Sequence, residues 1–121
     1  MKRLLVVLLL MVASTSVQAY EKWDCTELFD TEVLVTAIES QPGQGTVTAM
    51  GTTHEAEVRV EGLKKAWLFG GFNKHDVFNY SLVIKPTGDA FYYDYTDAEE
   101  DKGVIPSMTF YCTVVSTVAP G

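Results

Sequence analysis

The two histidines of the chain, His54 and His75, are the side chains best suited to acid–base catalysis near neutral pH. His75 stands next to Asp76, so an imidazole and a carboxylate are neighbours in the sequence. Nucleophilic catalysis would also need a serine, threonine or cysteine activated by such a base, and neither histidine has a nucleophile-elbow motif nearby. We predict no catalytic residue. The alternative is a small hydrolytic enzyme that uses His75, Asp76 and a carboxylate from residues 94–101.

The acidic run of residues 94–101 has the composition of a calcium loop without its spacing. An EF-hand loop needs acids at alternating positions, a central glycine and a late glutamate, and these offsets fail here. The two histidines lie in separate turns with no zinc-binding helical motif. We therefore predict no metal ion and no cofactor, with weak calcium binding by the acidic run as the alternative.

Aromatic residues occupy four of the five positions from 91 to 95. Successive side chains of a strand point to opposite faces, so Tyr92 lies on the face opposite to its aromatic neighbours. One interpretation is core packing through cross-strand aromatic pairs. The functional interpretation is a surface around Trp67, His75 and Tyr92 that binds a protein or a small ligand.

The chain begins with the pattern of a cleaved secretory signal. A basic start at residues 1–3 precedes an apolar run over residues 4–13 and a small-x-small step at residues 17–19. The run is shorter than the roughly 20 apolar residues of a transmembrane helix. We expect residues 1–19 to be removed and residues 20–121 to form a single β domain that is secreted or periplasmic.

The charge balance of the chain limits its partners. The whole chain has 9 basic and 16 acidic residues and a net charge of −7. Removal of Lys2 and Arg3 with the signal leaves seven basic residues and a net charge of −9. Such a surface repels phosphate backbones and anionic lipid heads. We expect no nucleic-acid partner, no membrane binding after signal cleavage, a cationic partner if there is one, and a monomer.

The two cysteines lie near opposite ends of the expected domain, at Cys25 and Cys112. In an exported chain, such a pair without metal-ligand spacing predicts a disulfide. Closing so long a loop stabilises the folded chain by roughly 4 to 5 kcal/mol on the chain-entropy model. Two free buried thiols are the alternative.

Period-two alternation predicts strands along most of the domain. Ala56, Val58 and Val60 alternate with charged residues, and residues 108–115 repeat this pattern with Cys112 on the inner face. Turn residues at 86–89 separate two further strands and predict a hairpin. About seven strands are expected in all, over residues 31–39, 46–50, 55–61, 63–69, 80–85, 90–95 and 108–115. They predict an antiparallel sandwich or small barrel, with an α+β fold containing a helix near residues 27–38 as the alternative.

The early cysteine, the β-rich middle and the terminal strand with the second cysteine resemble the general design of small periplasmic inhibitors and binding barrels. That likeness is architectural, and a fold does not determine a function. The sequence favours a non-enzymatic binding domain, one form of which is an acidic inhibitor of a basic secreted hydrolase. Besides the enzyme, the remaining alternative is a structural envelope protein without a ligand.

Overall fold

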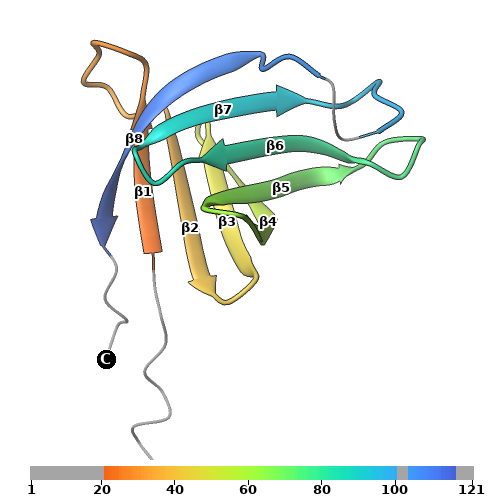
Figure 1. Cartoon of the computed structure of the whole chain (residues 1–121), viewed down its shortest axis with the longest axis horizontal. Coiled ribbons are helices and arrows are strands. Elements are labelled where there is room, and N and C mark those ends of the chain that lie inside the picture. The colour runs from red at the N-terminus through yellow and green to blue at the C-terminus, as the bar shows by residue number, and fades with distance from the viewer. Residues whose placement is uncertain (1–20, 101–103, 117–121) are drawn as a thin grey trace, which may run out of the picture.

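The structure is a computed structural model that describes residues 21–100 and 104–116, and these residues form eight strands and no helix. The strands are β1 (Glu21–Thr26), β2 (Val35–Gln41), β3 (Gln44–Ala49), β4 (Thr52–Glu61), β5 (Lys64–Phe72), β6 (Phe78–Ile84), β7 (Asp89–Asp94) and β8 (Met108–Ser116). Each strand pairs antiparallel with the next, and β8 pairs with β1, so the sheet closes into a barrel (Figure 1). The all-β prediction is confirmed, and the barrel is the form that the chain adopts. Within the described ranges no helix is long and apolar enough to cross a membrane.

The strand that the sequence does not predict is β1. Its six residues, EKWDCT, contain one fully buried side chain, Cys25, so the alternation is weak. The alternative helix near residues 27–38 is absent, because residues 27–34 form an irregular connection and β2 begins only at Val35. Asp30 holds this connection in a turn, since its Oδ1 accepts the backbone N–H groups of Thr31 and Glu32 at 2.7 and 3.2 Å.

Alternating strand directions give the barrel two distinct ends. The loop end carries the connections at residues 27–34, 50–51, 73–77 and, as far as the structure describes it, 95–100 and 104–107. The terminal end carries the start of β1, the end of β8 and three short turns. In Figure 1, β5, β6 and β7 cross β1 and β2 steeply, and the connection between β1 and β2 lies on the opposite side of the picture from the connection between β5 and β6. The predicted signal peptide, residues 1–19, lies outside the described residues.

The disulfide closes the seam of the barrel. Cys25 in β1 lies directly opposite Cys112 in β8, with 4.0 Å between their Cα atoms and a sulfur–sulfur bond of 2.04 Å. Both cysteines are buried, and Cys112 faces the interior as its position in the alternation predicts. The predicted disulfide is confirmed.

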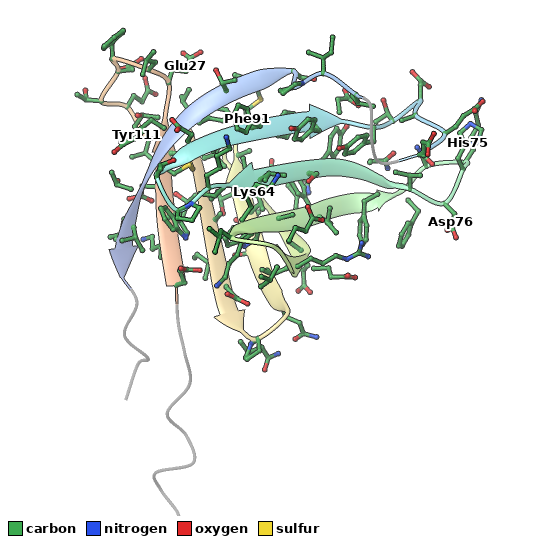
Figure 2. The ribbon with its side chains drawn as sticks, in the orientation of Figure 1. Glu27, Lys64, His75, Asp76, Phe91 and Tyr111 are labelled. Atoms are coloured by element: carbon green, nitrogen blue, oxygen red, sulfur yellow. A yellow bond between two sulfur atoms is a disulfide. The ribbon has the colours of Figure 1, made fainter. Side chains whose placement is uncertain are left out.

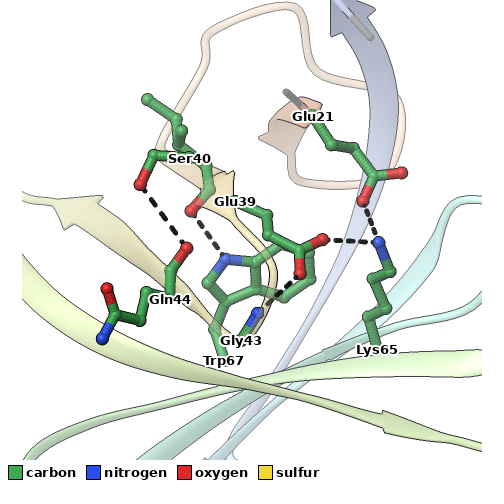
Figure 3. Close-up of polar contacts among 8 residues, drawn as sticks. Glu21, Glu39, Ser40, Gly43, Gln44, Lys65 and Trp67 are labelled. Atoms are coloured by element: carbon green, nitrogen blue, oxygen red, sulfur yellow. Dashed lines mark hydrogen bonds and ion pairs between the residues drawn. The ribbon is translucent and has the colours of Figure 1, made fainter. Parts of the chain in front are cut away.

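Large and small side chains together form the core of the barrel. Trp67 and Leu82 have no exposed surface, and the small residues Ala37 and Ala90 belong to the same buried cluster. The Trp67 Nε1–H donates a hydrogen bond of 3.0 Å to the Ile38 carbonyl oxygen (Figure 3). This bond satisfies a donor that would otherwise be buried without a partner.

A three-residue ionic cluster covers the terminal end. Lys65 Nζ lies 2.7 Å from Glu21 Oε1 and 2.6 Å from Glu39 Oε1 (Figure 3). Burial lowers the pKa of Lys65, but the hydrogen bonds and charges of the two glutamates outweigh burial and raise it overall. The cluster links β1, β2 and β5 across the end of the barrel.

A bulge in β5 shapes the loop end. Phe69 pairs with Tyr80 and Phe72 pairs with Phe78, so Gly70 and Gly71 together oppose a single residue of β6. Both glycines have a positive φ, +85° and +76°. A Cβ on Gly70 would lie 2.4 Å from Tyr80 Cδ2. Glycine at this position therefore lets the Tyr80 ring lie directly against the backbone of β5.

Candidate functional site

The loop end of the barrel contains a partly open pocket of about 590 Å³. One side is formed by residues 32–35 and by the β3–β4 hairpin at residues 49–52. The other side is formed by inward-facing residues of β4 to β8. Farther from the loop end, Trp67 and Leu82 on the same inward faces are fully buried in the core.

Aromatic rings form the wall of the pocket. Phe69 packs against Tyr80 at 5.6 Å between ring centroids, and Tyr80 stacks on Tyr92 at 5.9 Å with 16° between the rings. The His54 ring contacts Phe69 at 5.4 Å, and Phe110 of β8 also lines the pocket. Since neighbouring strands supply these side chains, the wall is continuous from β4 to β8.

The pocket lining contains few polar side chains, and three of them can form hydrogen bonds with a ligand. The hydroxyl groups of Tyr80 and Tyr92 and the His54 imidazole have no hydrogen-bond partner among the residues that the structure describes. Burial raises the pKa of Tyr92 to about 12, with smaller contributions from Tyr80 and Asp94. The Tyr92 phenol therefore stays protonated at neutral pH and can donate or accept a hydrogen bond.

Exposed apolar side chains lie at the loop end. Val33 and Met50, which line the pocket, are 47% and 95% exposed. Leu28 and Phe29, in the connection between β1 and β2, are 69% and 98% exposed. Phe29 and Met50 also adopt a positive φ, +67° and +52°, which costs energy in any residue with a side chain. Strained residues of this kind concentrate where a protein binds something.

The three predicted binding residues lie in three different environments. Tyr92 faces inward and lines the pocket. Trp67 lies one layer deeper, fully buried in the core, and has no surface to offer a ligand. His75 lies in the β5–β6 connection, far from β1 in Figure 2, and does not line the pocket. The three residues therefore do not meet at one site.

The connection that holds His75 is organised by Asn73. The Asn73 Oδ1 accepts the backbone N–H groups of His75 at 2.7 Å and Val77 at 3.1 Å, and its Nδ2 donates to the carbonyl oxygens of Tyr95 and Ala98. The connections at 73–77 and 95–100 are thus tied together. The His75 side chain is exposed and has no hydrogen-bond or ion-pair partner within the described residues.

Part of the acidic run, 94–100, is described, and it begins with a local turn. Asp94 Oδ1 accepts hydrogen bonds from the backbone N–H of Thr96 at 3.0 Å and from its hydroxyl at 2.7 Å. Across residues 21–100 and 104–116, no three histidine, cysteine or acidic side chains lie close enough together to hold a metal ion.

Strand alternation would have located most of the pocket residues that sequence reasoning missed. His54 lies two residues before Ala56 on the inward face of β4, and Tyr80 lies two residues before the buried Leu82 of β6. Phe110 likewise precedes Cys112 by two. Each inward series therefore continues toward the loop end, but only the closed barrel shows that these continuations face one another.

Comparison of the chain with protein-family models, with curated proteins and with solved structures finds no significant match. The fold and the site instead define the protein by its architecture. It is an eight-stranded up-and-down antiparallel barrel with a disulfide at the seam and an aromatic-walled pocket at one end.

Proposed function

We propose that this protein is a non-enzymatic binding protein of the periplasm or the extracellular space, and that it holds a small apolar ligand in the pocket at the loop end. The observation that carries the proposal is the pocket of about 590 Å³ with its wall of aromatic rings. A partly open pocket of this kind leaves apolar surface in contact with water, and an apolar ligand would bury that surface favourably.

The size and the lining of the pocket both support a small-molecule ligand. Pockets for small molecules hold roughly 300 to 1,000 Å³ and combine an apolar lining with a few placed polar groups. Here Tyr80, Tyr92 and His54 supply the polar groups, while Phe69 and Phe110 supply apolar contact. The exposed side chains of Val33 and Met50, which also line the pocket, extend this surface outward.

Titration with the neutral hydrophobic dye Nile red tests the proposal. We expect saturable binding of one dye per chain, with a rise in dye fluorescence because the pocket excludes water. Ala49 lines the pocket and is partly buried, so Ala49→Trp should block the dye. The matched control is Thr113→Trp, on an exposed position of β8. Absence of saturable binding, or equal binding by two variants that melt like the wild type, would contradict the proposal.

A second candidate function is recognition of a basic protein, including inhibition of a basic secreted hydrolase. The observation that favours it is the pair of almost fully exposed apolar side chains, Phe29 and Met50, on an acidic molecule. Such side chains often anchor a partner. Association with pancreatic ribonuclease or lysozyme, measured by calorimetry, should weaken with salt and with Phe29→Ser. Salt-independent association, or none with either protein, counts against this function.

A further inference from the structure

The two ends of the barrel differ in charge. Within the described residues, the connections of the loop end and the three strand residues that border each of them on either side carry nine acidic residues and one basic residue, Lys74. The acidic residues are Asp24, Glu27, Asp30, Glu32, Asp76, Asp94, Asp97, Glu99 and Glu100. The terminal end, counted in the same way, carries four acidic residues, Glu21, Glu39, Glu61 and Asp89, and five basic ones, Lys22, Arg59, Lys64, Lys65 and Lys85. The electric field of the described residues therefore draws cations toward the end that contains the pocket.

The pocket lining carries negative charge, as does the loop end of the barrel that contains it. None of its fourteen residues is a lysine or arginine, and Glu32 is its one carboxylate. Glu32 is exposed and belongs to the connection between β1 and β2, near the exposed Val33 at the mouth. By contrast, Phe69 and Phe110 are 3% and 7% exposed. The pocket thus has an apolar interior and an acidic mouth.

From these observations we infer that the ligand is a small cationic amphiphile, with an apolar body and an ammonium-type head. This inference rests on the proposed function of the pocket. The body lies against Phe69, Tyr80 and Phe110, where burial of apolar surface supplies the affinity. The head stays at the mouth beside Glu32, where it keeps most of its hydration and avoids the cost of burying a charge. Aromatic rings within reach of the head add a further attraction for a cation.

Three detergents that share one alkyl chain separate charge from apolar contact. Decyltrimethylammonium, decyl maltoside and decyl sulfate, each below its micelle concentration, are used to displace Nile red and are also titrated directly by calorimetry. We expect the cation to bind about tenfold more tightly than the anion at low salt, with the neutral detergent between them. The ratio should fall toward one in 1 M salt, where the screening length is about 3 Å.

Two charge-neutralising variants test whether the preference for the cation arises at the mouth of the pocket. Glu32→Gln should reduce the ratio of cation to anion affinity by about two- to fivefold. Glu61→Gln removes the same charge from an exposed position at the terminal end and should leave the ratio unchanged. Both substitutions are at exposed positions, and neither side chain has a hydrogen-bond or ion-pair partner among the described residues.

Each outcome of these titrations decides the inference. Equal affinities for the three detergents, or tighter binding of the anion, would overturn it and leave the proposed function intact, since the dye would still bind. An equal effect of Glu32→Gln and Glu61→Gln would also overturn it, because the preference would then come from net charge alone. Failure of both the dye and all three detergents to bind would instead refute the proposed function.

Discussion

Replacing Gly70 by alanine should deform the wall of the pocket. Gly70 has a φ of +85°, and an added Cβ would lie 2.4 Å from Cδ2 and 2.9 Å from Cε2 of Tyr80. Either the tyrosine ring or the bulge of β5 must therefore move. Gly71 is a matched control, because its φ is +76° and an added Cβ would meet nothing within 4 Å. Both variants impose a left-handed conformation on alanine, but only Gly70→Ala also creates a steric clash.

The two costs can be separated by size. A residue with a Cβ in the left-handed region costs about 1 to 2 kcal/mol, which we expect as the loss in free energy of unfolding for Gly71→Ala. Overpacking adds about 1 to 3 kcal/mol, so Gly70→Ala should lose about 2 to 5 kcal/mol in total. Because Tyr80 lines the pocket, its displacement should also weaken dye binding about fivefold in Gly70→Ala, the equivalent of one lost aromatic contact.

Urea denaturation followed by far-UV circular dichroism measures the first effect, and Nile red titration measures the second. Gly71→Ala alters no pocket contact, so its affinity for the dye should stay within about twofold of the wild-type affinity. The fivefold loss expected for Gly70→Ala corresponds to about 1 kcal/mol of binding free energy. If both variants lose equal stability, the contact with Tyr80 is not as close as the structure places it. If Gly70→Ala binds the dye normally, Tyr80 is not part of the binding wall.

Three further predictions concern the core, the seam and the pocket phenol. Trp67→Phe removes the N–H group that donates to the Ile38 carbonyl oxygen. It should lower the free energy of unfolding by about 1 to 3 kcal/mol in urea titrations and leave dye affinity unchanged. Weaker dye binding at unchanged stability would make Trp67 a ligand contact instead. Reduction of the disulfide between Cys25 and Cys112 should lower Tm by about 15 to 30 °C, measured by thermal melting with and without reductant, and an unchanged Tm would argue against its stabilising role. Tyr92, whose pKa is raised by burial to about 12 from the ordinary 10.0, should ionise after the exposed tyrosines in an absorbance titration. Tyr92 holds its proton more tightly in the folded protein than in the unfolded chain, so its contribution to the free energy of unfolding is complete below about pH 10 and is lost as the pH rises through 12. Tyr92→Phe should remove this loss of stability at high pH. A loss that persists in the variant belongs to another phenol.

Much of the strand pattern is local information and could be predicted from the sequence. The alternation of Ala56 and Val58 with charged residues identifies the centre of β4, and the same period places Cys112 on the inner face of β8. The turn residues at 86–89 mark the hairpin between β6 and β7. β1 could not be predicted from alternation, because most of its side chains are only half-buried. Its place in the sheet depends on pairing with β2 and β8.

The binding residues could be predicted only in part. Aromatic crowding near residue 92 drew attention to Tyr92, which does line the pocket. The same criterion selected Trp67, which the barrel buries completely, and passed over His54. Composition shows that an aromatic side chain will be partly buried somewhere. It does not show whether that residue lies in a filled layer or in a hollow one.

The sequence by itself determined the β character of the chain, its acidity, the pairing of its two cysteines and the inward or outward direction of most side chains, because these depend on residue type and on a period of two. Only the tertiary structure decided that eight strands close into a barrel, that the hollow lies at the loop end, and that Tyr92, Tyr80 and His54 line it together. Those features arise from the register and spread of strands distant in the sequence, which no local pattern encodes.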